Sequence, residues 1–267
     1  MESFHQTLTQ HCVIAAKIAG EFLLHNQQRI GQIKINEKST NQLVTEIDIE
    51  AEKIIISYLQ SHYPDASFVG EENTVLKPKV NDLQFIIDPL DGTTNFLHGL
   101  PMYSVSIAAT FHQVLVSGVV FIPVLAQCFY ATKNGGAFLN NQAIEVSCSK
   151  VLSESLLATG FPYYNFKQMN EYLNCLKYLM ENTRGLRRMG SAAIDLAYTA
   201  SGNFCGFFEL NLNTWDVAAG ALLVKEAGGI YSNIGGDKFD ISGKSIIAAN
   251  PYIYTSLQTL LLKELKQ

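Results

Sequence analysis

Two carboxylates three residues apart, Asp88 and Asp91, follow an apolar run at 84–87 that predicts a buried strand. Together with the Leu90 carbonyl they supply the oxygen ligands that hard divalent cations prefer. The Gly-Thr-Thr of 92–94 then offers successive backbone N–H groups, an arrangement that binds anions such as phosphate. The segment indicates either two cations beside a phosphate or an ordinary turn whose carboxylates are solvated.

A second acidic segment, Gly70-Glu71-Glu72, also follows a strand-like run, at 67–69. Glu71 would add a carboxylate to the same cation site and help to remove a proton from an attacking water. The alternative is a strand end that carries exposed charge.

Two further polar residues lie where helices are predicted to begin. Asp216, in a Trp-Asp-Val-Ala-Ala-Gly segment, either caps its helix or binds a cation, and the two roles are compatible. Ser191 lies in a Gly-Ser-Ala-Ala segment, where small residues leave N–H groups open to an anion or a polyol, or simply permit close helix packing. The preceding Arg187 and Arg188 are typical of solvated charges.

Elements of both kinds must position these side chains, and hydrophobic periodicity predicts where they lie. Helical spacing predicts helices at 4–24, 46–63, 168–182, 191–201, 216–227 and from 252, with a loop or hairpin at 27–42. Alternating or apolar runs predict strands at 84–87, 104–109, 114–122, 128–131, 156–159, 204–208, 230–232 and 246–249. Short turns between the runs of 68–139 indicate a meandering antiparallel sheet.

The absence of repeats and of a linker predicts one compact α/β domain over 1–267, with two packed halves at about 1–150 and 151–267. Hydrophobic residues make up 48% of the chain and charged residues 16%, which excludes a disordered protein. The formal net charge of −5 argues against nucleic-acid or anionic-membrane binding by the whole surface.

The chain is expected to be cytoplasmic and to have no membrane partner. Its longest apolar run, at 114–126, is too short to span a bilayer. Its five cysteines include no Cys-x-x-Cys pair, which favours small apolar residues in a reducing compartment over a metal or redox motif.

Taken together, these segments resemble the inositol monophosphatase family of Mg²⁺-dependent, lithium-sensitive phosphatases, and its bacterial members most of all. The resemblance extends from about residue 10 to residue 255, with the order of the motifs intact, and it implies a five-layered αβαβα sandwich. The matching motifs are LVTEID at 43–48, GEE at 70–72, DPLDGTTNF at 88–96, LLATGFP at 156–162, RRMGSAAIDLAY at 187–198 and WDVAAG at 215–220.

The resemblance also implies a set of magnesium ligands. Glu71, Asp88 and the Leu90 carbonyl would hold one Mg²⁺, and Asp88, Asp91 and Asp216 a second. A third Mg²⁺ ion, bound more weakly, would be coordinated by Glu71. Lys38 matches the family's loop lysine for that ion by spacing, whereas Gln42 stands where the family usually has Asp or Asn.

Catalytic and substrate contacts are implied in the same way. Thr93, with Glu71, would orient the attacking water, and Asp48 would brace Thr93. The residues expected to contact the phosphate or the inositol ring are Asp91, Gly92, Thr93, Arg187, Ser191, Ala192, Glu209 and Asp216.

The implied activity is Mg²⁺-dependent hydrolysis of inositol 1-phosphate to inositol and phosphate, by in-line attack of a metal-activated water and without a covalent intermediate. The alternatives on the same metal site are fructose-1,6-bisphosphatase and NADP or nucleotide phosphatase activity. A different class of function is a non-catalytic binding role in transcription or ribosome maturation, as in some bacterial relatives. The resemblance also implies a homodimer.

Overall fold

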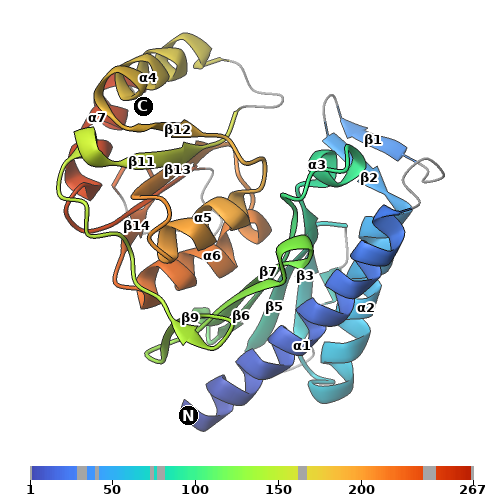
Figure 1. Cartoon of the computed structure of the whole chain (residues 1–267). Helices are drawn as coiled ribbons and strands as arrows, with labels where there is room; N and C mark the ends of the chain where they lie inside the picture. The colour runs from blue at the N-terminus through green and yellow to red at the C-terminus, as the bar shows by residue number, and fades with distance from the viewer. Residues whose placement is uncertain are drawn as a thin grey trace.

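The computed structural model describes residues 2–28, 35–39, 42–72, 75–76, 82–161, 167–236 and 245–265. Within these ranges an eight-stranded sheet (the large sheet) and a five-stranded sheet (the small sheet) alternate with three pairs of helices (Figure 1). The result is the five-layered αβαβα sandwich that the sequence analysis predicts.

The first half of the chain supplies two long helices and an eight-stranded sheet of order β10-β9-β8-β7-β6-β5-β3-β4. Its helices are α1 (Glu2–Gln27), α2 (Glu46–His62), α3 (Thr93–Leu97) and the 3₁₀ turn η2 (Pro123–Leu125). A separate hairpin pairs β1 (Ile35–Ser39) with β2 (Gln42–Thr45). The strands of the sheet are β3 (Ser67–Gly70), β4 (Val75–Leu76), β5 (Leu83–Asp91), β6 (Ser104–Phe111), β7 (Val114–Ile122), β8 (Gln127–Thr132), β9 (Gly136–Leu139) and β10 (Gln142–Ala143).

The second half supplies four α-helices, one 3₁₀ turn and a five-stranded sheet of order β12-β11-β13-β15-β14. Its helices are the 3₁₀ turn η3 (Leu152–Glu154), α4 (Met169–Asn182), α5 (Ala192–Ala200), α6 (Thr214–Glu226) and α7 (Tyr254–Glu264). Its strands are β11 (Leu156–Thr159), β12 (Gly185–Arg187), β13 (Gly206–Leu210), β14 (Ile230–Ser232) and β15 (Ser245–Ala249).

Helices α5 and α6 form the middle layer and contact both sheets. On the far side of the large sheet lie α1 and α2, and on the far side of the small sheet lie α4 and α7 (Figure 1). Helices α5 and α6, which belong to the second half of the chain, therefore pack on the large sheet of the first half. This packing brings together residues that are far apart in sequence.

Strands of both sheets are buried on their two faces. In β5, Phe85 and Ile87 pack toward α1 and α2, while Ile86 packs toward the middle layer. In β13, Phe207 faces the middle layer and Phe208 faces α4 and α7. Because successive side chains of a strand point to opposite faces, a strand between two helical layers must be apolar at nearly every position.

The predicted helices and strands are confirmed, with small shifts at their ends. The antiparallel meander is confirmed from β5 to β10, but β3 pairs parallel to β5 at its edge. The strand predicted at 204–208 lies at Gly206–Leu210, and the short α3 follows Gly92 where only a turn was expected. Of the loop or hairpin expected at 27–42, the structure has a hairpin that lies further along the chain, with β1 at Ile35–Ser39 and β2 at Gln42–Thr45. The Lys38 and Gln42 side chains lie outside what the structure describes.

None of the described helices is long and apolar enough to cross a membrane. All five cysteines are free thiols, four of them buried and Cys148 exposed.

The contact between β7 and helix α6 leaves little room for a side chain at Gly118 of β7. A Cβ there would lie 2.6 Å from the backbone oxygen of Ala219 in α6. We expect Gly118→Ala to lower the free energy of unfolding by about 1–3 kcal/mol, because the added methyl group must push α6 off the sheet. Urea denaturation measures the loss. Val114→Ala, at an exposed position of the same strand, is the control and should change stability by less than about 0.5 kcal/mol.

Candidate active site

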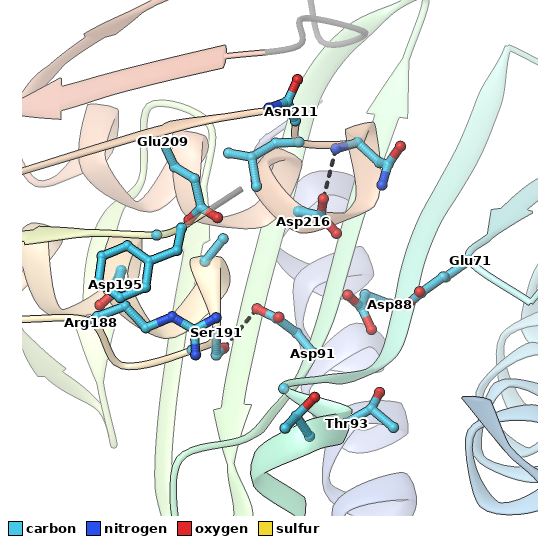
Figure 2. Close-up of a pocket in the computed structure, with 18 of the residues that line it drawn as sticks. Glu71, Asp88, Asp91, Thr93, Arg188, Ser191, Asp195, Glu209, Asn211 and Asp216 are labelled. Atoms are coloured by element: carbon cyan, nitrogen blue, oxygen red, sulfur yellow. Dashed lines mark hydrogen bonds between the residues drawn. The ribbon is translucent and has the colours of Figure 1, made fainter. Parts of the chain in front are cut away.

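One pocket brings together side chains from both sheets and from the middle helices (Figure 2). Glu71, Asp88 and Thr93 come from the first half, and Arg188 and Glu209 from the second. The acidic residues among the described part of its lining are Glu71, Asp88, Asp91, Asp195, Glu209 and Asp216. All the acidic residues that the sequence analysis assigned to metal therefore line a common cavity.

Parallel pairing of β3 with β5 places Glu71 beside Asp88. Gly70, the last residue of β3, lies opposite Ile87, and the Glu71 N–H donates to the Ile87 carbonyl over 3.1 Å. The two carboxylates thus leave the sheet from neighbouring strands at the same edge.

An irregularity in β5 turns Asp88 and Asp91 into the same pocket. The pairing of β5 with β6 shifts between these two residues, at Pro89 and Leu90. Pro89 has no N–H to donate, so it suits a position where the ladder is interrupted. The Leu90 N–H instead donates to Asp88 Oδ1 over 3.0 Å, which fixes the Asp88 carboxylate.

The N-terminus of α5 holds Asp91. The Ser191 hydroxyl donates to Asp91 Oδ2 over 2.6 Å, and the Ala193 N–H donates to the same oxygen over 2.8 Å (Figure 2). Ser191 also caps α5 by accepting from the Ile194 N–H. The sequence analysis left these donors open to an anion or a polyol. In the structure the Ser191 hydroxyl and the Ala193 N–H bind a carboxylate of the protein itself.

Asp216 is fixed by the start of α6. The helix begins at Thr214, and Asn213 is its N-cap. The Asn213 N–H donates to Asp216 Oδ2 over 2.6 Å, the contact of a capping box (Figure 2). The alternative interpretation made Asp216 the N-cap of this helix. In the structure Asp216 is instead the third residue of the helix, and its carboxylate lines the pocket.

Thr93 is the link between the pocket and Asp48. Its Oγ1 lies 3.0 Å from Asp48 Oδ1 and 3.1 Å from the Leu90 carbonyl oxygen, so its single proton has two acceptors. Asp48 is 1% exposed in the first turn of α2. It lies behind Thr93 and is not part of the pocket lining.

Burial and mutual repulsion disfavour the charged form of these carboxylates. Desolvation raises the pKa of Asp88 well above its ordinary value, and the charges of Glu71, Asp91 and Asp216 raise it further. Desolvation likewise raises the pKa of Asp216. The pKa of Asp91 rises to about 6, mainly through desolvation, although the hydrogen bonds from Ser191 and Ala193 oppose the shift.

A second group of charges lies on the opposite side of the pocket: Arg188, Asp195 and Glu209 (Figure 2). Desolvation raises the pKa of both Asp195 and Glu209 well above the usual range. Gly160 leaves room for Glu209, because a Cβ there would lie 1.9 Å from the Glu209 carboxyl carbon.

The structure places Arg188, not Arg187, at the pocket. Arg187, which the sequence analysis assigned to substrate, is exposed, and its Nη1 donates to the Leu186 carbonyl over 2.9 Å. Adjacent residues of an extended segment point in opposite directions, so only one of the two arginines can face inward. The sequence analysis did not assign Asp195 to the site, although it lies four residues after Ser191. A single acidic residue in an otherwise apolar helix gives no sign that it lines a pocket.

As placed in the structure, no three of the described His, Cys, Asp and Glu side chains are arranged to hold a metal ion. The donor set nevertheless has the chemistry that a hard cation requires, since it consists of carboxylates and a backbone carbonyl. Like charges that are buried together are also relieved when a cation lies between them.

Comparison with known proteins agrees with this geometry. A model of the inositol monophosphatase family matches residues 5–267. The Nus factor SuhB of Pseudomonas aeruginosa is 41% identical over 249 residues, which are 92% of each chain. The inositol-1-monophosphatase of Rhizobium meliloti is 37% identical over 243 residues, 91% of each chain.

Among solved structures, the extragenic suppressor protein suhB of Bartonella henselae superposes with a TM-score of 0.93 at 38% identity, over 96% of this chain and 99% of that one. The family model and these relatives extend over nearly the whole chain. The chain therefore belongs to the inositol monophosphatase family.

Proposed function

We propose that the protein is a Mg²⁺-dependent phosphatase that hydrolyses the phosphate monoester of a polyol, with inositol 1-phosphate as the substrate. The observation that supports this most directly is the convergence of Glu71, Asp88, Asp91 and Asp216 on one pocket. Membership of the family and the name of the Rhizobium meliloti relative agree with it.

On this proposal the donor set would hold two or three Mg²⁺ ions. Glu71, Asp88 and the Leu90 carbonyl would hold the first, and Asp88, Asp91 and Asp216 the second. A third would lie beside Glu71. Bound there, Mg²⁺ would lower the pKa of a water molecule and stabilise the departing alkoxide.

The chain's own groups would align the attacking water. Thr93 Oγ1 lies within hydrogen-bond distance of Asp48, so when Thr93 donates to Asp48 its lone pairs face elsewhere and can accept from a water. Glu71 lines the same side of the pocket and would accept the water's other proton. Asp48 would act through Thr93 by fixing the direction of its hydroxyl.

Gly92 and Thr93 would donate backbone N–H groups to the phosphate. Gly92 has φ 98°, in the left-handed region, and a Cβ there would lie 2.9 Å from the Met102 carbonyl oxygen. Glycine therefore permits both the turn and the close approach. Ser191, Ala192 and Glu209, with Asp91 and Asp216, line the space left for the inositol ring.

A second candidate function rests on the relatives. The Pseudomonas aeruginosa relative is named a Nus factor, and we infer from that name that this chain associates with a transcription complex. Such binding would use the surface of the protein and would not require the carboxylates of the pocket.

The metal-free protein should lose stability as pH rises. The folded pKa of Asp91, about 6, lies above the 3.8 of the unfolded chain, and those of Asp88 and Asp216 are also raised. The folded state then binds more protons than the unfolded state, so the free energy of unfolding falls between about pH 4 and pH 6 and beyond. In EDTA, the thermal midpoint followed by circular dichroism should therefore be lower at pH 8 than at pH 5.

Added Mg²⁺ should raise that midpoint, and more at pH 8 than at pH 5, because the ligands must be deprotonated. Asp91→Asn should flatten the pH dependence, whereas Asp65→Asn, at an exposed position, should leave it as in the wild type. A midpoint that does not respond to Mg²⁺ at pH 8 would contradict the proposed site.

Asp91→Asn should lower kcat at least about a hundredfold, because it removes a charged ligand of the proposed metal site without changing side-chain volume. Phosphate release with Mg²⁺ is the measurement, on inositol 1-phosphate, fructose 1,6-bisphosphate, NADP and nucleotide 3′-phosphates. The fold should remain intact by circular dichroism. Full activity of the wild type in excess EDTA would refute the metal-dependent mechanism, and a preference for another substrate in the panel would reassign the substrate.

The transcription-complex hypothesis predicts that tagged wild-type chain and Asp91→Asn retain RNA polymerase subunits equally, as identified by mass spectrometry. Equal retention is expected because Asp91 lies inside the pocket, bound to Ser191 and Ala193. If neither protein retains polymerase subunits, this second function is rejected.

A further inference from the structure

Asp195 lies in the half of the pocket that faces away from the proposed metal ligands. Figure 2 shows Asp195, Arg188 and Glu209 on one side, and Asp88 and Glu71 on the other. If the proposed metal ligands hold the phosphate, the alcohol that carries it would extend into this half of the pocket.

The Asp195 carboxylate is buried but poorly satisfied. It lies in the first turn of α5 and is 1% exposed, and no described residue donates a hydrogen bond to its Oδ1. Two donors at the start of this helix are engaged elsewhere. The Ser191 hydroxyl and the Ala193 N–H both donate to Asp91.

A buried acceptor without a donor costs stability, so a native structure that keeps one calls for an explanation. Asp195 lines the pocket, where a ligand can supply the missing donor. The polar groups beside Asp195 indicate which class of ligand would fit. Glu209 is a second acceptor on the same side and Arg188 is a donor.

A pocket side that carries both acceptors and a donor suits hydroxyl groups, because each hydroxyl donates one hydrogen bond and accepts others. A ring with several neighbouring hydroxyls would satisfy Asp195 and Glu209 together while accepting from Arg188. A planar leaving group without hydroxyls would satisfy neither carboxylate.

We propose that Asp195 determines specificity by accepting a hydrogen bond from a hydroxyl of the substrate's alcohol part, and so selects polyol phosphates. The inference rests on the proposed phosphatase function and assigns to Asp195 a role that concerns substrate choice rather than the chemical step.

The test compares two substrates that share the phosphate but differ in the alcohol: inositol 1-phosphate and p-nitrophenyl phosphate. Asp195→Ala should lower kcat/KM for inositol 1-phosphate by about tenfold to a hundredfold, the effect of losing one hydrogen bond to a charged group. The change should fall mainly on KM. For p-nitrophenyl phosphate, kcat/KM should stay within about twofold of the wild type.

Asp195→Asn keeps a side-chain oxygen acceptor, so it should recover part of the lost kcat/KM for inositol 1-phosphate. Both variants should melt at the same temperature as the wild type or higher in the absence of substrate, because each removes a carboxyl group whose burial costs stability. Tyr198→Phe is the matched control on the same helix. Its hydroxyl donates to Gln127 outside the pocket, so both substrates should be unaffected.

Equal losses for the two substrates, or a lower melting temperature, would mean that Asp195 only supports the fold, and the proposal would fall while the phosphatase assignment stood. An unchanged preference in Asp195→Ala would overturn it as well. A wild-type protein that hydrolyses neither substrate would overturn both this inference and the proposed function.

Discussion

Repulsion between buried carboxylates is the constraint around which this structure is arranged. Asp88 and Asp91 come from β5 and Asp216 from α6, and the charges of Asp91 and Asp216 raise the pKa of Asp88. Each of these carboxylates accepts a hydrogen bond from one backbone N–H: Asp88 from Leu90, Asp91 from Ala193 and Asp216 from Asn213. Each bond fixes one oxygen of a carboxylate and leaves its second oxygen able to take a ligand. The carboxylates are thus oriented before any ligand arrives.

These backbone donors explain why the middle layer matters. Two of them belong to the starts of α5 and α6, so the acidic pocket forms only when the second half docks on the large sheet. Asn95 reinforces that docking, because its Nδ2 donates to the Met102 carbonyl in its own half and to the Met189 carbonyl in the other. The site therefore depends on long-range packing rather than on any one segment.

Sequence alone predicted what local patterns determine. Apolar runs located β7 and β11 to the residue, and the spacing of Asp88 and Asp91 after a strand indicated the pocket. The parallel pairing of β3 with β5 was not predictable, because register between distant strands depends on tertiary contacts. Helix boundaries are uncertain by a residue or two, which is why Asp216 was considered as a cap when Asn213 fills that position. The inward-facing arginine depends on which way each residue of an extended segment points, and two adjacent arginines give no hint of it.

The two functions suggested by the relatives make different demands on the interior. A chain that served only as a binding surface would need no pocket lined by acidic side chains, and it would be more stable if Asp195 and Glu209 were apolar, because their burial disfavours their charged forms. Departures from good packing that cost stability are typical of sites where a ligand supplies the missing contacts. The acidic pocket is therefore best explained by small-molecule chemistry.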